Sequence, residues 1–290
     1  MSEVKVEATR RWEQCGRKGV PKVAELIREL KPGQKILVAF WHGIGDLLMF
    51  RPVYQQLVNA FPEHEFTLSL IPGVSHTDIF PFGKEISSEN FLDDHDYAFV
   101  IDFPMCEGKD GVTKAEYCLQ VEIGDIGNTP VVLPRLPRQQ NTLVGVHFQG
   151  TCLPGATNPD PELAKRIWDD LVDAGYVPID LHFEHTFHNP VNEPYLWAER
   201  SCRGLKPRLS TLLMMIQRCR TVVAVASGPF VLSMCHNPVS TVYLQKSHKV
   251  DCYVKNFKNV VDLKNYDTKT FLDVVRNADG IGPIPIKRVV

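Results

Sequence analysis

An aspartate that follows two glycines is placed to do chemistry in this sequence. The apolar stretch KILVAFW (35–41) runs directly into HGIGD (42–46), which ends in Asp46, and a helical pattern follows. The glycines are expected to let the backbone turn tightly and approach a ligand, and the start of a helix favours an anion. A dinucleotide fingerprint, Gly-x-Gly-x-x-Gly, would need a third glycine near position 48, where the chain has Leu48. The loop therefore predicts a ligand site and argues against a nicotinamide cofactor.

Asp46 has two competing roles. As a helix cap, its carboxylate would accept a backbone N–H group, a contact worth about 1 kcal/mol. As a general base, it would take a proton from a reacting hydroxyl group. Pro52 slightly favours the base, because a regular helix that began at Asp46 would lose an interior hydrogen bond at the proline. We expect this helix either to kink or to begin nearer Arg51, which would leave Asp46 in a freer loop.

A second turn has the composition of a phosphate site. An apolar strand ends at Ala226, and Ser227, Gly228 and Pro229 then lead into a helix whose first turn holds the proline. The N–H groups of Ser227 and Gly228, together with the Ser227 hydroxyl, would form a nest of the size of a phosphate. Taken alone, the same sequence is more typical of an ordinary strand-to-helix turn with Ser227 as the N-cap.

A third loop, HFQGTCLPGATN (147–158), follows an apolar strand and carries polar side chains. His147, Gln149, Thr151 and Thr157 are the members that could donate hydrogen bonds to a diphosphate. Loops of this composition are common, so this loop supports a ligand site only in combination with the two turns above.

The segment HFEHTFH contains four residues of metal-ligand type, His182, Glu184, His185 and His188. The segment leaves a predicted strand, where a spacing of three residues does not bring imidazoles together as it would on a helix. We therefore expect a polar loop that lines a cleft, and no metal site.

The candidate residues fall at the ends of short apolar strands that alternate with helices. Strands that are apolar almost throughout are typical of parallel sheets buried on both faces. Two consecutive runs of strand–helix units predict an α/β protein with two Rossmann-like domains that face each other across a cleft. The proline-rich stretch 127–142 is the expected linker. The expected parts are a helical arm (1–34), an acceptor domain (35–140), a nucleotide-sugar domain (141–278) and a tail (279–290). The expected strands are 35–41, 66–71, 97–103, 143–148, 177–183, 221–227, 240–245 and 259–264, with helices at 159–176, 209–220 and 267–277.

Composition excludes some classes of protein. Lys and Arg number 32 against 34 Asp and Glu, so the net charge of −2 gives no global reason to expect binding to nucleic acid or to a membrane surface. The eight cysteines form no Cys-x-x-Cys pair and are typical of free thiols in a reducing compartment. No apolar run approaches the roughly 20 residues of a membrane span. These features predict a cytoplasmic protein without a membrane span.

An ordered set of segments resembles glycosyltransferase family nine, the ADP-heptose:lipopolysaccharide heptosyltransferases. The resemblance covers about residues 35–275. The segments that carry it are GIGDLLMFRPVYQQL (43–57), DYAFVIDF (96–103), KAEYCLQVEIGD (114–125), VGVHFQG (144–150), LAKRIWDDLVDAGYVPIDL (163–181) and LSTLLMMIQRCRTVVAVASGPFVLSMCHNPVSTVYLQ (209–245).

The resemblance implies a GT-B fold and a metal-independent transfer, with inversion, from a nucleotide-diphosphate sugar to an acceptor hydroxyl. The acceptor would bind the N-terminal domain and the donor the C-terminal domain, without a cofactor. Asp46 falls at the position of the family's catalytic base, and the Ser227 turn at that of its phosphate site. The implied donor-binding residues are Gly43, Gly45, Gln149, Thr151, Ser227, Gly228 and Pro229, and the implied acceptor-binding residues are His42 and Arg51.

Three departures from the family concern the donor. Ala226 stands where the family commonly has an acidic residue, and Val231 where it commonly has a histidine. The family's lysine after the strand at 143–148 has no evident counterpart near Thr157 and Asn158, unless Lys165 or Arg166 substitutes for it. We therefore expect a donor other than ordinary heptose.

Two alternatives remain open. The acceptor, expected to be a glycan, could instead be a hydroxylated DNA base, which would need a basic face on the first domain; Arg51, Lys84, Lys109 and Lys114 are too few to decide this. The chain could also be a non-catalytic protein that binds a sugar nucleotide. The sequence does not predict the oligomeric state.

Overall fold

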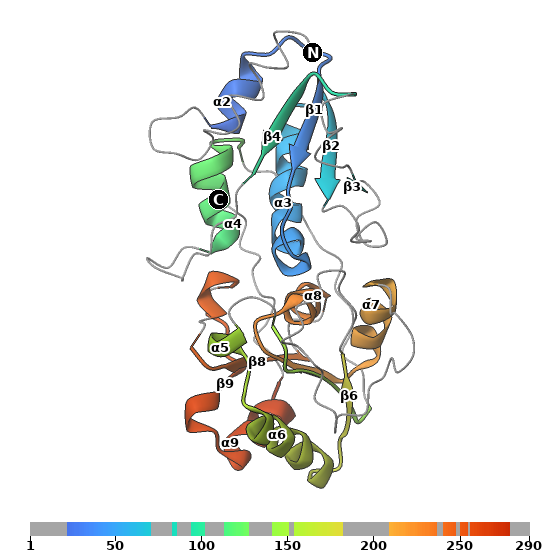
Figure 1. Cartoon of the computed structure of the whole chain (residues 1–290), viewed down its shortest axis with the longest axis vertical. Coiled ribbons are helices and arrows are strands. Elements are labelled where there is room, and N and C mark those ends of the chain that lie inside the picture. Colours follow the sequence, from blue (N-terminus) through green and yellow to red (C-terminus); the bar gives the residue numbers. More distant parts are fainter. Residues whose placement is uncertain are drawn as a thin grey trace. The chain divides into compact units, whose positions relative to one another are not determined.

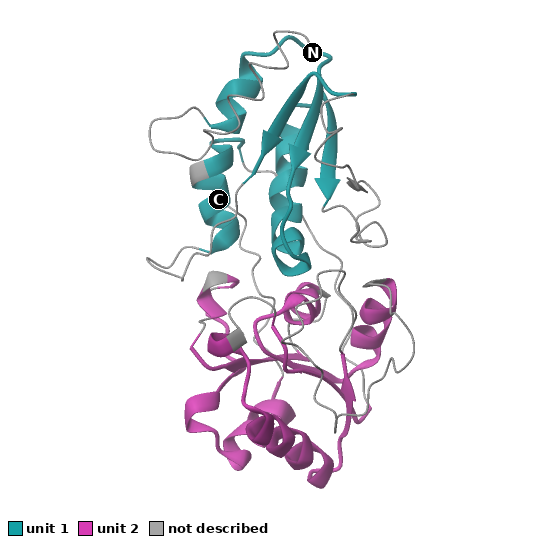
Figure 2. Ribbon diagram, in the orientation of Figure 1, with its two compact units in different colours: residues 1–132, 287–290 teal, residues 133–286 magenta. Residues whose placement is uncertain are grey.

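The computed structural model divides into two compact units, which Figure 2 shows in different colours. Unit 1 comprises residues 1–132 and 287–290, and unit 2 comprises residues 133–286, so the division falls inside the stretch 127–142. The structure describes residues 22–70, 83–85, 94–101, 113–127, 141–150, 154–181, 209–236, 240–247, 250–254 and 256–278.

Unit 1 is built on a parallel sheet of four strands in the order β3-β2-β1-β4 (Figure 1). Its central strand, β1, is buried from Ile36 to Ala39, because it has a strand on either side and side chains packed on both faces. The strands are β1 (Lys35–Ala39), β2 (Glu65–Leu70), β3 (Gly83–Glu85) and β4 (Tyr97–Val100).

The helices of unit 1 are α2 (Val23–Arg28), α3 (Ile44–Ala60) and α4 (Lys114–Tyr117), which continues as a π-helix (Cys118–Ile123). The prediction that the helix after β1 begins nearer Arg51 is wrong, since α3 begins at Ile44 and runs through Pro52. Buried side chains on both sides of the proline, such as Phe50 and Val53, offset the hydrogen bond that it removes.

Unit 2 is built on a parallel sheet of five strands in the order β6-β5-β7-β8-β9. One face packs against α6 and α9 through a buried cluster that includes Val223, Ile167 and Phe271. On the other face α8 contacts β8, where the rings of Phe230 and Tyr243 lie 4.7 Å apart, and Figure 1 shows these helices on opposite sides of the sheet. The strands are β5 (Leu143–His147), β6 (Val177–Asp180), β7 (Thr221–Ala224), β8 (Thr241–Gln245) and β9 (Val260–Asp262), and the helices are α5 (Pro154–Thr157), α6 (Pro161–Asp173), α7 (Leu209–Arg218), α8 (Gly228–His236) and α9 (Thr268–Arg276).

Helix α6, expected at 159–176, begins with Asp160 as its N-cap and Pro161 as its first residue. The Asp160 carboxylate accepts the N–H group of Leu163 at 2.8 Å. The C-cap is Ala174. Gly175 follows with a φ of +83°, the left-handed conformation that glycine adopts readily just beyond a helix end.

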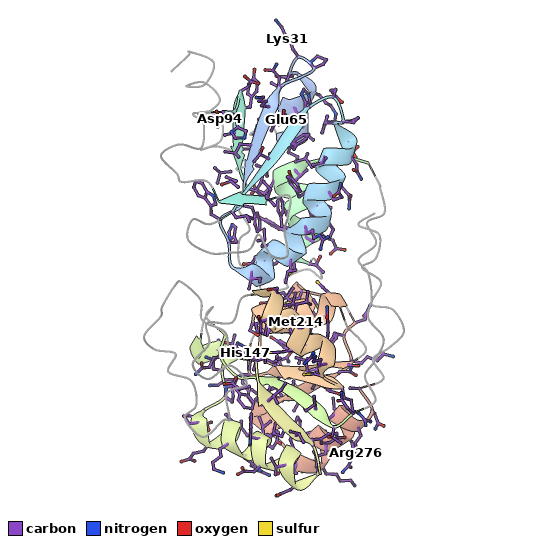
Figure 3. All side chains as sticks on the ribbon, turned by 90° about the vertical axis from the view of Figure 1, so that its right-hand side faces the viewer. Lys31, Glu65, Asp94, His147, Met214 and Arg276 are labelled. Atoms are coloured by element: carbon purple, nitrogen blue, oxygen red, sulfur yellow. The ribbon has the colours of Figure 1, made fainter. Side chains whose placement is uncertain are left out.

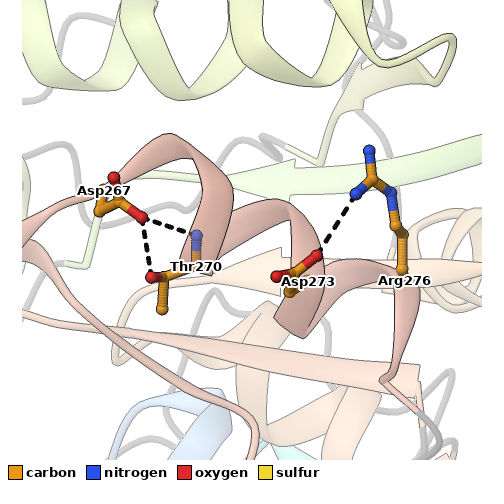
Figure 4. A network of polar contacts seen from close by, with 4 residues as sticks. All are labelled: Asp267, Thr270, Asp273 and Arg276. Carbon is orange, nitrogen blue, oxygen red and sulfur yellow. Dashed lines mark hydrogen bonds and ion pairs between the residues drawn. The ribbon is translucent and has the colours of Figure 1, made fainter.

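Helix α9 provides a test of acid stability (Figure 4). The Asp267 carboxylate accepts hydrogen bonds at 2.8 Å from the N–H and the hydroxyl of Thr270, and these bonds lower the pKa of Asp267 below its usual value of 3.8. A lowered pKa means that the ionised form stabilises the fold above pH 3.8 and that this contribution disappears as the pH falls through the lowered pKa. Asp267→Ala should therefore lower the thermal midpoint at pH 7, and the gap to the wild type should close below pH 3.8. At pH 7 the control Asp273→Ala, which removes an exposed pair with Arg276, should barely shift the midpoint.

Among the described residues, no helix has both the length and the apolar character needed to cross a bilayer.

Candidate active site

Asp46 lies in the first turn of α3, just beyond the carboxyl end of β1. The N-cap of α3 is Gly43, and no side chain caps this helix. The Asp46 carboxylate instead accepts a hydrogen bond from Lys114, with 2.6 Å between Nζ and Oδ1. The structure therefore does not use Asp46 as a cap, and the carboxylate remains available for chemistry.

Lys114 is the site residue that sequence reasoning missed. Its side chain is 4% exposed and that of Asp46 is 24% exposed, so the lysine is buried beneath a carboxylate that solvent can still reach. Lys114 is the first residue of α4, whose start is fixed by a reciprocal bond between the N-cap Thr113 and Glu116. Because 68 residues separate the two partners, no local pattern could have revealed the pair.

The two glycines before Asp46 do not form the tight turn expected of them. Gly43 has φ −61° and ψ 162°, a conformation open to any residue, and Gly45 is an ordinary residue of the first helical turn. A tight glycine-dependent turn is therefore not present. A Cβ atom at Gly43 would have no heavy atom within 4 Å, so the backbone there is open to an approaching ligand. His42, just before α3, and Arg51, within α3, are both half-buried, and the His42 ring lies 4.6 Å from that of Phe40.

In unit 2, Ser227 stands immediately before α8. Its hydroxyl donates to the carbonyl of Val225 at 2.9 Å and accepts the N–H of Phe230 at 3.4 Å, as an N-cap does. The hydroxyl proton is therefore engaged within the turn. The N–H groups of Ser227 and Gly228 donate to no described residue, so they can serve an anion. Pro229 is buried in the first turn of α8.

Beside this turn the loops after β5 and β8 are joined by a hydrogen bond, and the loop after β5 packs against the turn after β7. A Cβ atom at Gly150 would lie 2.3 Å from the carbonyl oxygen of Ala226, so only glycine fits there. The Gly150 N–H donates to Asn158 Oδ1 at 2.7 Å, and Lys246 Nζ donates to the Asn158 carbonyl at 3.0 Å. Among the described residues, no carboxylate pairs with Lys246. The network therefore places in these loops a positive charge that no carboxylate of the described residues pairs with.

The other residues expected to bind the donor from the loop after β5 differ in burial and in hydrogen bonding. His147 is buried at the carboxyl end of β5, where Figure 3 labels it. Gln149 is half-buried, and Thr157 is buried with its hydroxyl donating to Asn158 Oδ1 at 3.0 Å. Thr151 lies outside the described residues. The hydrogen bond from the Thr157 hydroxyl therefore joins two residues of the loop.

Lys165 and Arg166 do not substitute for the family's lysine. Lys165 pairs with Asp169 at 2.5 Å on the exposed face of α6. Arg166 donates to Thr268 at 3.0 Å and lies over the Tyr266 ring, so its partners are at the start of α9 and just before it. The lysine that reaches the loop at Asn158 is Lys246, which comes from the loop after β8.

Nothing in the described parts of the two units points to a metal or to a reactive thiol. No group of three or more His, Cys, Asp or Glu side chains there could hold a metal ion, and the segment 182–188 lies outside the description. Cys118, Cys219 and Cys235 are free thiols. Burial raises the pKa of Cys219 to about 12, so this thiol stays protonated and is a poor nucleophile.

The chain was compared with known proteins. Its sequence matches no protein-family model and no curated protein. Solved structures do match. The iron-containing dodecameric glycosyltransferase TibC from enterotoxigenic E. coli H10407 matches with a TM-score of 0.55 and 16% identity, over 77% of this chain and 63% of that one. E. coli heptosyltransferase WaaC with ADP matches with a TM-score of 0.54 and 12% identity, over 84% of this chain and 99% of that one.

The chain thus spans less than two thirds of TibC and nearly the whole of WaaC. At such low identity the likeness concerns the fold. The two parallel sheets with their helices confirm the predicted α/β class. The chain has the GT-B-type fold of the bacterial heptosyltransferases that its segments resemble.

Proposed function

We propose that this chain is a glycosyltransferase that moves a sugar from a nucleotide-diphosphate sugar to an acceptor hydroxyl. The observation that carries the proposal is a partly exposed Asp46 carboxylate, held by Lys114 in the first turn of α3. The fold supports it, because WaaC was solved with ADP and TibC with ADP-D-beta-D-heptose.

The proposed chemistry is one displacement with inversion. Asp46 takes the proton of the acceptor hydroxyl while that oxygen attacks the anomeric carbon. The bond between this carbon and the diphosphate oxygen breaks, and the nucleoside diphosphate leaves with the electron pair. A positioned general base of this kind contributes about 10²- to 10⁴-fold in rate.

The leaving diphosphate needs positive charge as it departs. The N–H groups of Ser227 and Gly228 can donate to its oxygens, and the Lys246 ammonium, which has no carboxylate partner among the described residues, can balance its charge. These groups would do the work that a metal does in other transferases, so the proposal includes transfer without a metal.

The donor in this proposal differs from ordinary heptose. Ala226 and Val231 are both buried and bring no polar side chain to the turn. The Ala226 carbonyl is packed against Gly150, which leaves no room for a side chain at position 150. An acidic residue and a histidine could form hydrogen bonds with sugar hydroxyls. The side chains of Ala226 and Val231 cannot.

A screen of ADP-, UDP- and GDP-sugars tests the proposal by thermal shift and by release of nucleoside diphosphate. One nucleotide class should stabilise the chain, by about 2.7 kcal/mol at a ligand concentration 100 times Kd. The same class should be hydrolysed slowly, with water as the acceptor. EDTA should leave the rate of nucleoside diphosphate release unchanged. Loss of this activity with EDTA would contradict the proposal that the transfer needs no metal. Stabilisation without release by any sugar nucleotide would favour a non-catalytic binding protein.

A further inference from the structure

We infer that Lys114 is a positioning residue that holds one oxygen of the Asp46 carboxylate and leaves the other for the acceptor hydroxyl. Lys114 Nζ lies 2.6 Å from Oδ1, and Oδ2 accepts no hydrogen bond from a described residue. The carboxylate is therefore fixed at one end and open at the other. The inference rests on the proposed role of Asp46 as the base.

Two other helices of unit 1 show how an acidic third residue can cap a helix start. Glu25 is the third residue of α2, and its carboxylate turns back to the N–H of Lys22 at 3.0 Å. Glu116 is the third residue of α4 and bonds in the same way to the N–H of Thr113 at 2.8 Å. Such a bond stabilises a helix start.

Asp46 is also a third residue, in α3, yet its carboxylate bonds to Lys114 and caps nothing. The backbone N–H groups at the start of α3 have no acceptor among the described residues. They therefore compete with Lys114 for the Asp46 carboxylate. Lys114 keeps the Asp46 carboxylate out of the capping position. In that position the carboxylate would point toward the backbone of α3, and the oxygen left for the acceptor hydroxyl would be occupied.

Lys114 is itself held in place. As the first residue of α4 it follows Thr113, whose N–H and hydroxyl both donate to Glu116 Oε2, at 2.8 and 3.1 Å. Helix α4 continues into the π-helix, and both segments pack against α3. Single π-helical turns are frequent at functional sites. The ammonium group thus reaches Asp46 from a rigid neighbour and not from a mobile loop.

Removing the lysine is a cleaner test than removing the aspartate. A substitution of Asp46 takes away the carboxylate that faces the buried Lys114 ammonium, so its effect on activity mixes loss of the base with loss of this ion pair. Lys114→Met places an apolar side chain of similar length at a buried position, and the partly exposed Asp46 can then be hydrated. Lys114→Arg keeps a charged donor. Lys165→Met, which removes the exposed lysine of a similar pair on α6, is the matched control.

The expected results combine kinetics with hydrogen exchange, using the sugar nucleotide that the wild type hydrolyses. Lys114→Met should lower kcat by about 10²-fold with KM for the donor unchanged, because the base is misplaced while the donor site is intact. Lys114→Arg should recover much of the loss, and Lys165→Met should behave as the wild type. Amide exchange at residues 43–46 should slow in Lys114→Met, because Asp46 then caps α3.

The outcomes separate this inference from the proposed function. If Lys114→Met had the kcat of the wild type while Asp46→Asn was inactive, Lys114 would not be a positioning residue. The role of Asp46 as the base would remain supported. Full activity in Asp46→Asn would overturn the base role, and the exchange measurement would then decide on positioning alone. Unchanged exchange at residues 43–46 in Lys114→Met contradicts the inference. If Lys114→Met does not fold, Lys114→Gln supports the same comparisons.

Discussion

Asp46→Asn should keep sugar-nucleotide binding and lose transfer by about 10²- to 10⁴-fold, the usual contribution of a general base. Asparagine has the same shape, and its amide oxygen can still accept the hydrogen bond that Lys114 now donates to Oδ1. The amide cannot take up a proton from a hydroxyl, so the chemistry is lost while the start of α3 keeps its geometry. The measurement is kcat for diphosphate release, beside the Kd for the nucleotide from thermal shift.

The chain offers a matched control for this experiment. Asp169 pairs with Lys165 on α6 at 2.5 Å, but both side chains are about half exposed. Asp169→Asn therefore removes the same charge from the same kind of pair at a position with no proposed chemistry, and turnover should not change. If Asp46→Asn turned over like the wild type, Asp46 would not be the base.

Gly150→Ala should weaken binding of the sugar nucleotide about tenfold or more and lower the free energy of unfolding by about 1–3 kcal/mol. The added Cβ would lie 2.3 Å from the carbonyl oxygen of Ala226 and 3.2 Å from Thr157 Oγ1. A backbone atom cannot move aside as a flexible side chain can. The turn that carries the Ser227 and Gly228 N–H groups must therefore shift.

Gly155→Ala is the control for this prediction. Gly155 lies in α5, in the same loop region, and a Cβ there would have no heavy atom within 4 Å. It should therefore bind the nucleotide and unfold as the wild type does, as measured by titration and thermal melting. Equal affinity in Gly150→Ala and Gly155→Ala would show that the Ala226 turn takes no part in donor binding.

The fold could be predicted well from the sequence because its strands are apolar and locally recognisable. Each of the eight expected strands occurs with shifts of a few residues, such as Lys35–Ala39 for 35–41 and Thr241–Gln245 for 240–245. Strand β3 (Gly83–Glu85) was not expected, because its three residues include a glycine and two charged side chains. Its pairing depends on the neighbouring β2 and not on its own pattern.

The site was less predictable, since its decisive contacts join distant segments. The candidate base could be selected from its place after a strand, but its partner Lys114 is 68 residues away. The same holds for Gly150, whose need for glycine comes from the carbonyl of Ala226 on another strand loop. The course of α3 through Pro52 was misjudged because a local rule about proline ignored the buried neighbours.

The π-helix after α4 sets the rotation of α4 about its axis. Each hydrogen bond of a π-helix spans one more residue than that of an α-helix. The π-helix Cys118–Ile123 therefore has more residues in each turn than an α-helix has. Each residue of an α-helix rotates the next by about 100°. With Ile123 anchored in the interior, deletion of one residue from the π-helix would turn the preceding helix by about that angle. Lys114 would then point away from α3, so its bond to the Asp46 carboxylate depends on the number of residues in the π-helix.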